Sequence, residues 1–516
     1  MIKWQRISLA LLLAFVGALA LRVPRLAVRP LHNDEAVNAV KVADLWQHGR
    51  YRYDPDEYHG PTLHYATVPF LWLSGAHNPD EITDTTLRLA PLAFGIGLIL
   101  LLPLFADGLG RPALAWAGIF IAVSPAMVFY SRYFIHEMLL VFFSALTLGA
   151  GWRYIQSRTA GWAALTGAAL GLMFATKETF VISVAAMAVA GAATVWWAAQ
   201  KGGGVQSLVA CWHWQHAALA LGAALVVWLL FFSSFFSNFA GLSDSVRTYL
   251  PWLKRAGGHS PHIHPWNYYL ARLAWFHPAK GPVWSEGLIL GLALTGTVVS
   301  LAGKKSWLHR FVALYTIVLT ALYSAISYKT PWCLLNFYFG IILLAGVGAG
   351  AMVEFFRTRI AKILIVTGLA AFTVQLAWQA WRASIVYAAD RRNPYVYAQT
   401  SPDLLNLVQR AEGLARVAPA GYDTVIKVIA PDSDYWPLPW YLRRFKNVGW
   451  YEKLPDDPFA PIVMVSSKLN ARLDDRSGRK WIMAGITELR PGIFFELYVE
   501  LELWKKYVDT LPRDRD

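Results

Sequence analysis

Cysteine and charge are the two things that this sequence has little of. Only Cys211 and Cys333 occur in 516 residues. One lies in a short tryptophan-rich polar interval and the other at the start of an apolar run, which excludes a disulfide framework and thiol redox chemistry. Charged residues make up 16% of the chain and apolar or aromatic ones 56%, with a mean hydropathy of +0.38. This balance excludes an ordinary soluble protein and a disordered one.

Long apolar runs separated by short polar loops fill most of the first 380 residues. A membrane-spanning helix needs about 20 apolar residues. Eleven runs fit this length, at residues 7–27, 87–106, 113–130, 138–153, 162–175, 179–199, 217–236, 284–302, 308–326, 333–353 and 360–381. We therefore expect a mainly α-helical fold, a polytopic membrane bundle of eleven spans.

The basic residues between the runs predict the orientation. Alternate loops put twelve of them on one side, namely Lys3, Arg6, Arg111, Arg153, Arg158, Lys201, Lys304, Lys305, Arg310, Arg357, Arg359 and Lys362. Only Arg132, Lys177 and Lys329 fall in the opposite short loops. The rule that cytoplasmic loops are basic predicts a multi-pass protein of the cytoplasmic (inner) membrane with its N-terminus in the cytoplasm. A cleavable signal peptide ending at Ala18-Leu19-Ala20 is the alternative for the first run.

Two domains follow from this topology. Residues 1–382 form the membrane domain, with two long outer loops at 28–86 and 237–283, the first of which should hold short helices rather than a sheet. Residues 383–516 form an extracytoplasmic α/β domain, with a helix at 402–415, strands at 424–430 and 462–466, and a final run at 493–503. Its aromatic segment 435–441 fits either core packing or acceptor docking.

The net charge of +14 does not indicate nucleic acid. From residue 383 onward 19 basic residues meet 18 acidic ones, so the excess flanks the spans. The 15 acidic residues of positions 1–382 are unevenly placed, because nine of them fall between Asp34 and Asp84. The first outer loop is therefore acidic.

Adjacent carboxylates follow the first span in His32-Asn33-Asp34-Glu35-Ala36. They can simply cap a helix, because Asn33 or Asp34 before a helical run fits an N-cap. A carboxylate here can also take the proton from an incoming hydroxyl or anchor a divalent cation, with its neighbour orienting it. The spacing does not choose between these readings.

Three short outer turns carry basic residues that face this acidic loop. They hold Arg132, His136 and Glu137, then Lys177 and Glu178, then Tyr328 and Lys329. Arg132 can pair with Glu137 across its turn, and a single lysine can serve as an interface anchor. Three basic turns around one acidic loop favour a cleft for an anionic head group, because Arg binds phosphate through paired donors and Lys as a point charge.

Histidines also gather on the outer side, at His59, His64, His259, His262 and His264. A His-x-His pair in a loop is a weak metal signal, and solvated or substrate-bonding histidines explain it as well.

Several short segments, taken together and in their order along the chain, resemble the GT-C membrane glycosyltransferases. They are residues 32–36, 51–65, 131–137, 175–179, 328–336 and 434–441. The resemblance covers the whole chain. Within that superfamily the chain looks most like the flippase-activity-associated family, which is related to protein O-mannosyltransferases and to the lipid A aminoarabinose transferase.

The resemblance implies transfer of a sugar from a polyprenyl-phosphate donor to an extracytoplasmic protein, lipid or polysaccharide acceptor, with inversion. It implies Asp34 as general base or metal anchor with Glu35 beside it, and Glu137 as the acid of the second turn. His59, where such enzymes have a basic residue before a proline, would bind the lipid phosphate when protonated, or Arg132, Lys177 and Lys329 would take over this role. The other candidate substrate-binding residues are His136, Glu178 and Tyr328. A divalent metal ion is the one cofactor left open. A lipid-linked sugar flippase or a non-catalytic GT-C scaffold are the alternatives.

Overall fold

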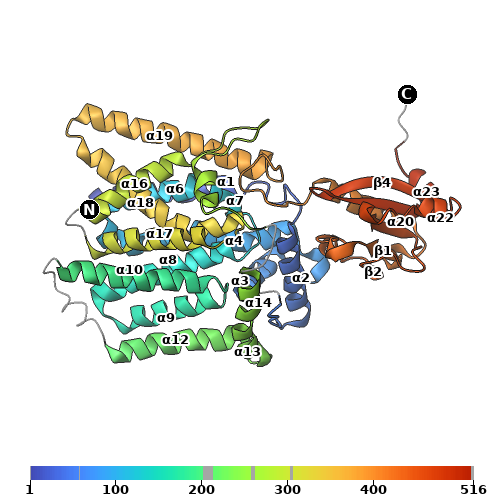
Figure 1. The fold of residues 1–516 in the computed structure, drawn as a ribbon, viewed down its shortest axis with the longest axis horizontal. Coiled ribbons are helices and arrows are strands. Elements are labelled where there is room, and N and C mark those ends of the chain that lie inside the picture. Colours follow the sequence, from blue (N-terminus) through green and yellow to red (C-terminus); the bar gives the residue numbers. More distant parts are fainter. Residues whose placement is uncertain (1, 57–58, 201–212, 257–261, 303–305, 513–516) are drawn as a thin grey trace.

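The structure is a computed structural model that describes residues 2–56, 59–200, 213–256, 262–302 and 306–512. A bundle of long helices forms one end of the molecule and a small domain with a β-sheet forms the other (Figure 1). Short helices lie between the two. Cys333 is a free thiol, and Cys211 lies outside the described residues.

The bundle consists of helices that follow the apolar runs. They are α1 (Ile2–Arg22), α4 (Asp84–Leu101), α5 (Ala106–Leu109), α6 (Arg111–Val123), α7 (Pro125–Ser131), α8 (Glu137–Ser157), α9 (Ala160–Phe174), α10 (Phe180–Gln200), α12 (Trp214–Phe232), α16 (Gly287–Ala302), α17 (Trp307–Ala325), α18 (Leu335–Phe355) and α19 (Arg359–Trp381).

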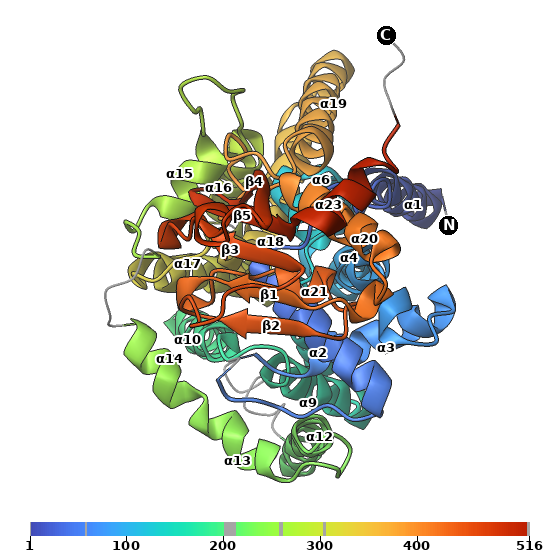
Figure 2. The ribbon, with the colours of Figure 1, turned by 90° about the vertical axis from the view of Figure 1, so that its right-hand side faces the viewer.

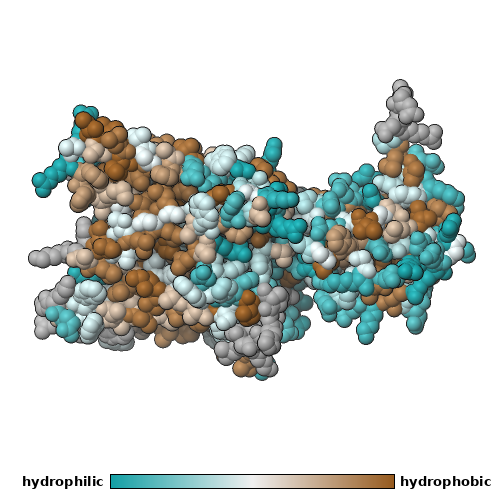
Figure 3. Space-filling view, turned by 45° about the horizontal axis from the view of Figure 1, so that its top comes forward, coloured by the Kyte–Doolittle hydropathy of each residue, from teal (hydrophilic) through white to brown (hydrophobic). Residues whose placement is uncertain are grey.

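Seven helices of the described residues are long and apolar enough to cross a membrane, and α6 with α7 forms an eighth, bent candidate. Three shorter apolar helices, at 8–22, 160–174 and 287–302, complete the set. Each of the eleven apolar runs of the sequence coincides with one of these candidates. The face of the bundle seen in Figure 3 is largely hydrophobic, whereas that of the sheet domain is more hydrophilic. These are the features of a multi-pass membrane protein, and the predicted fold class is confirmed.

Helix α18 is the most enclosed of the candidate spans, with 94% of its apolar window buried. Glycines let α16 approach it closely. A Cβ on Gly296 would lie 1.8 Å from the carbonyl oxygen of Leu344, and one on Gly348 would lie 2.0 Å from that of Leu292. Small residues at helix crossings are how membrane helices pack without a hydrophobic driving force between them.

The two long loops between the apolar runs fold into short helices. The first loop holds α2 (Asn33–His48) and α3 (Thr62–Ser74), and the second holds α13 (Ala240–Arg247), α14 (Tyr249–Ala256) and α15 (Tyr268–Ala274). The prediction of helices rather than a sheet in the first loop is confirmed.

The C-terminal domain is an α/β unit around a five-stranded sheet of order β2-β1-β3-β5-β4. Its elements are α20 (Asp403–Val417), β1 (Ile426–Ile429), α21 (Leu438–Tyr441), β2 (Val448–Tyr451), β3 (Ile462–Ser466), α22 (Leu473–Arg476), β4 (Trp481–Arg490), β5 (Ile493–Glu500) and α23 (Leu501–Val508). Strand β1 runs parallel to β2 and β3, whereas β5 pairs antiparallel with β3 and β4.

The aromatic segment of this domain docks onto the bundle. Trp440 is 1% exposed and packs in the cluster formed by the first loop and its neighbouring helices. The indole of Trp440 and the hydroxyl of Tyr441 donate to the two carboxylate oxygens of Asp84, at 2.8 and 2.7 Å. Arg443 donates to the carbonyl of Ile82 at 2.7 Å. Packing is thus the role that the structure shows for Trp440 and Tyr441, and it sets the sheet in front of the bundle (Figure 2).

Candidate functional site

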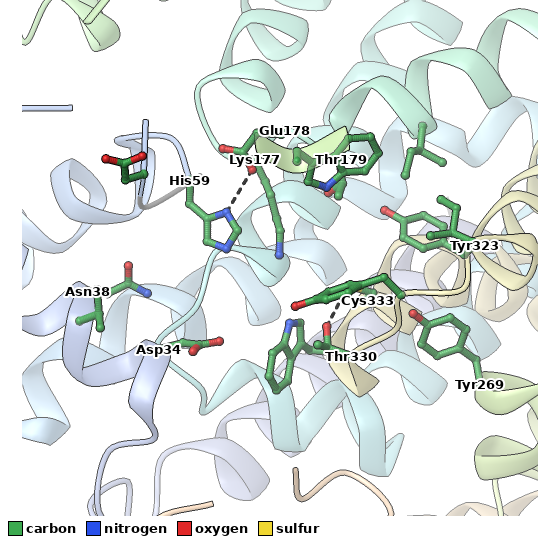
Figure 4. Close-up of a pocket in the computed structure, with 17 residues that line it drawn as sticks. Asp34, Asn38, His59, Lys177, Glu178, Thr179, Tyr269, Tyr323, Thr330 and Cys333 are labelled. Carbon is green, nitrogen blue, oxygen red and sulfur yellow. Dashed lines mark hydrogen bonds and ion pairs between the residues drawn. The ribbon is translucent and has the colours of Figure 1, made fainter. Parts of the chain in front are cut away.

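A pocket of about 350 Å³ opens between α2, the turn that joins α9 to α10, and the chain between α17 and α18. Its charged lining residues are Asp34, Asp56, His59, Lys177 and Glu178, and its aromatic ones are Trp252, Tyr269, Tyr323, Tyr328 and Trp332. Figure 4 shows these side chains converging from separate elements, with Asp34 across the cavity from His59 and Lys177. The pocket therefore joins acidic and basic groups that are distant in the sequence.

Asp34 lies in the first turn of α2, and its side chain is 49% exposed. The residue that caps α2 is His32, so the expected cap at Asn33 or Asp34 is wrong. The backbone N–H of Asp34 donates to His32 Nδ1 at 3.1 Å. Because Glu35 and not Asp34 completes the capping box, the carboxylate of Asp34 is left to face the pocket.

Glu35 lies outside the pocket, fully buried beneath α2. Arg29 and Arg88 donate to its carboxylate at 2.5 to 3.0 Å. The backbone N–H groups of His32 and Phe134 each donate to it at 2.9 Å. Burial by itself would raise the pKa of Glu35, but the two guanidinium groups hold it well below its usual value. Glu35 therefore ties the first loop to the bundle.

Backbone pairing holds the first loop against the turn after α9. Gly60 N donates to Thr176 O and Thr62 N to Ala175 O, both at 3.1 Å, and His59 forms a bridge with Lys177. A Cβ on Gly60 would lie 2.0 Å from the carbonyl oxygen of Ala175, so only glycine permits this approach. The pairing places His59 Nδ1 3.1 Å from Glu178 Oε2.

Lys177 is 6% exposed at the pocket wall and donates to the carboxylate of Glu137. Burial would lower the pKa of Lys177, but the carboxylate of Glu137 outweighs it and raises that pKa above the usual value. Glu137 itself does not line the pocket. The ammonium group thus stays charged at the cavity and is held in place from behind.

Arg132 and His136 lie behind the pocket as well. Arg132 donates to the backbone carbonyls of Arg22, Pro24 and Arg25 at 2.6 to 2.7 Å. The alternative that Arg132 pairs with Glu137 is therefore wrong. His136 is fully buried, with Nε2 3.0 Å from Gly60 O and its ring centroid 5.0 Å from that of His59. Burial lowers the pKa of His136 well below its usual value, so it packs as a neutral imidazole.

Of the third predicted turn, Tyr328 lines the pocket and Lys329 does not. The backbone N–H of Lys329 donates to His262 O at 2.8 Å, and its Nζ donates to the carbonyls of His264, at 3.2 Å, and Ile326. Backbone carbonyls thus bind this lysine, two of them from the segment 237–283, and its side chain does not line the cleft in which we expected it.

The histidines of the second loop make local contacts. His262 Nδ1 lies 2.6 Å from the hydroxyl of Tyr397, and the ring of His264 stacks on that of Tyr268 with centroids 4.1 Å apart. His259 lies outside the described residues. Within the described ranges no group of three or more His, Cys, Asp or Glu side chains could hold a metal ion.

Sequence reasoning missed Asp56, Trp252, Thr330 and Cys333 among the lining residues. Asp56 belongs to the acidic stretch of the first loop, so its signal was present but not specific. Thr330 and Cys333 belong to residues 328–336 and follow the predicted turn of Tyr328 and Lys329, so their signal was present too. The place of Trp252 depends on the path of the chain between α12 and α18.

The comparisons with known proteins agree with this architecture. Residues 62–243 match the family model of dolichyl-phosphate-mannose-protein mannosyltransferase. No curated protein matches the sequence. ArnT from Cupriavidus metallidurans, solved with undecaprenyl phosphate, is similar over 95% of this chain and 98% of its own, with a TM-score of 0.58 and 16% identity.

A second similar structure is the Archaeoglobus fulgidus oligosaccharyltransferase tethered to an acceptor peptide. It covers 86% of this chain and 63% of its own, with a TM-score of 0.52 and 13% identity. Both structures are GT-C glycosyltransferases. The chain therefore has the GT-C fold, as the sequence resemblance predicted.

Proposed function

We propose that this chain is a membrane glycosyltransferase that moves a sugar from a polyprenyl-phosphate donor to an extracytoplasmic acceptor, with inversion at the anomeric carbon. The observation that carries the proposal is that the carboxylate of Asp34 and the ammonium of Lys177 line one pocket at the same end of the helix bundle. The similar ArnT structure is bound to undecaprenyl phosphate, and the similar oligosaccharyltransferase structure is tethered to an acceptor peptide. These ligands support a lipid-linked donor and a separate acceptor.

Asp34 is the general base in this proposal. Its carboxylate accepts the proton of an acceptor hydroxyl as the hydroxyl oxygen forms a bond to the anomeric carbon. The bond between that carbon and the donor phosphate oxygen breaks on the opposite face, and its electron pair leaves with the lipid phosphate. The half-exposed position of Asp34 leaves its carboxylate accessible to an incoming hydroxyl.

Lys177 and His59 serve the leaving group. Positive charge placed where negative charge develops stabilises the transition state more than the ground state. The ammonium of Lys177 remains charged because Glu137 holds it. His59, at the position where the resemblance implies a basic residue, is oriented by Glu178 at 3.1 Å. The donor's lipid tail stays beside the helices while its head group enters the pocket.

A divalent metal ion does not enter this mechanism. Asp34 and Asp56 both line the pocket, but among the described residues no three His, Cys, Asp or Glu side chains lie close enough together to hold an ion. The proposed transfer therefore depends on the side chains of Asp34, Lys177 and His59.

The direct test is sugar transfer by the full chain purified in detergent. Labelled polyprenyl-phosphate hexoses are incubated with an extract of the cell envelope, and the anomeric configuration of the product is determined by NMR. Transfer with inversion supports the proposal, and retention contradicts it. Proteoliposomes with labelled donor and no acceptor provide the second arm, since movement of the donor across the bilayer without transfer would identify a flippase instead.

A further inference from the structure

A second cavity, of about 580 Å³, lies between α8, α10 and α17. These three helices also approach the pocket, through Glu137 behind it and through Thr179, Ile182 and Tyr323 on its wall. On α17 the two cavities are separated by the length from Phe311 to Tyr323, which is about 18 Å at the rise of an α-helix. The second cavity therefore extends along the part of these helices that is farther from the pocket, up to Arg158 after α8 and Trp307 at the start of α17.

The walls of this cavity are mainly apolar. Leu148, Met187, Val195 and Phe311 contribute side chains from all three helices. Ile155, at its edge, is 41% exposed, so the cavity reaches the surface of the bundle that a bilayer would cover. A cavity of this size and lining is suited to an elongated apolar ligand.

Two polar groups indicate which kind of ligand this cavity binds. Trp152 lines it, is 7% exposed, and its indole N–H is buried without a hydrogen-bond partner. A buried donor without a partner costs free energy that a ligand acceptor would recover. Arg158, which ends α8 in the left-handed conformation, lies at the cavity as well and is exposed. A guanidinium group at a membrane surface is matched to phosphate.

We propose that this cavity binds an anionic phospholipid of the membrane leaflet opposite the pocket. One acyl chain lies between α8, α10 and α17, an ester carbonyl accepts from Trp152, and the phosphate lies at Arg158. A polyprenyl tail is a poorer match, because it carries neither an acceptor for the indole nor a charge for the guanidinium at that depth.

Two glycines allow the cavity to be filled without disturbing the backbone. A Cβ on Gly191 meets only Phe311, at 4.0 Å, and one on Gly151 meets only Thr166, at 3.9 Å. Gly191→Leu therefore extends side-chain atoms into the cavity. Gly291→Leu on α16 is the matched control, because nothing lies within 4 Å of a Cβ there and the residue does not line the cavity. Arg158→Asn removes the charge with a residue that tolerates the left-handed conformation.

The experiment is native mass spectrometry of the full chain, delipidated and titrated with dioleoyl phosphatidylglycerol or dioleoyl phosphatidylcholine. We expect phosphatidylglycerol to bind the wild type about tenfold more tightly than phosphatidylcholine. Gly191→Leu and Arg158→Asn should each weaken that binding about tenfold, and Gly291→Leu should leave it unchanged. A photoactivatable phosphatidylglycerol should label peptides from residues 147–158, 187–195 or 307–311.

Equal binding of the two lipids, unchanged binding in Gly191→Leu, or labelling confined to other helices would each contradict the proposal. Displacement of phosphatidylglycerol by polyprenyl phosphate from the wild type would show that the donor tail fills the cavity, and would contradict it too. If neither the wild type nor any variant retains lipid specifically, water is the only ligand of Trp152, and the proposal is contradicted. None of these outcomes depends on transfer activity, so the proposal can fail while the proposed function stands.

Discussion

Asp34 and Glu35 are neighbours in the chain, yet their carboxylates face opposite environments. The side chain of Asp34 is 49% exposed at the pocket, whereas that of Glu35 is fully buried between Arg29 and Arg88. The capping box of α2 enforces this division, because Glu35 turns back to bond the N–H of His32. A single turn of helix thus supplies one structural acid and one acid available to substrate.

Glu35→Gln should lower stability strongly while leaving the pocket's lining residues in place. The change leaves two guanidinium groups buried without their counter-ion, which costs about 3–5 kcal/mol. The pKa of Glu35 is lowered by folding, so its contribution is present above the ordinary carboxyl pKa and is lost only as pH falls through the lower folded value. The melting temperature of the variant should therefore lie below that of the wild type by the same amount at pH 8, 7 and 6. Asp34→Asn, at a half-exposed position, is the control and should melt like the wild type.

Lys177→Gln should both destabilise the fold and weaken donor binding, because it removes the cation from the pocket and leaves Glu137 buried without a partner. The double variant Lys177→Gln/Glu137→Gln separates the two effects. It should regain most of the lost stability, about 3–5 kcal/mol, since no unpaired charge remains. Its KM for the polyprenyl-phosphate donor should stay raised about tenfold. A KM that recovers together with the stability would mean that Lys177 is only structural.

Gly60→Ala should displace the first loop from the turn after α9. The added carbon would lie 2.0 Å from the carbonyl oxygen of Ala175, and overpacking of this kind costs about 1–3 kcal/mol. Because His59 is positioned by that pairing, we expect a higher KM for the donor as well as a lower melting temperature. Gly17→Ala, where no atom lies within 4 Å of the new carbon, should change neither. Unchanged kinetics in Gly60→Ala would mean that the backbone pairing between the first loop and this turn does not position His59 for donor binding.

Trp440→Ala should loosen the C-terminal domain from the bundle. The indole is buried against the first loop and donates to Asp84, and loss of a buried tryptophan costs about 3–5 kcal/mol. Limited proteolysis between residues 383 and 402 should become faster by at least about tenfold. Trp504→Ala, which packs only within the C-terminal domain, should not accelerate that cleavage. Equal cleavage rates in the two variants would contradict the docking role.

Periodicity and hydropathy predicted most of the fold. The helix at 402–415 and the strand at 462–466 correspond to α20 and β3, and the final run divides into β5 and α23. Strands β2 and β4 were not predicted. β2 has only four residues, including Gly449, and β4 carries Gly485 between two register shifts that interrupt its alternation.

The site could be predicted only in part, for identifiable reasons. Asp34, His59, Lys177, Glu178 and Tyr328 were expected to converge and all line the pocket. Glu35 was expected to act together with Asp34. The capping box was not recognised in the sequence because histidine is not a common helix cap. Lys329 and Arg132 were expected in the cleft, but their donors bond to backbone carbonyls. Most of these carbonyl groups belong to segments distant in the sequence, and no local sequence pattern predicts where those segments lie.

The most direct measurement is the turnover of Asp34→Asn with a polyprenyl-phosphate sugar donor, beside Asp56→Asn as a second carboxylate at the same pocket. Loss of the general base should reduce the rate of sugar transfer about 10²–10⁴-fold, with no change in donor binding, while Asp56→Asn should keep a rate close to that of the wild type. Transfer by Asp34→Asn at the wild-type rate would contradict the account.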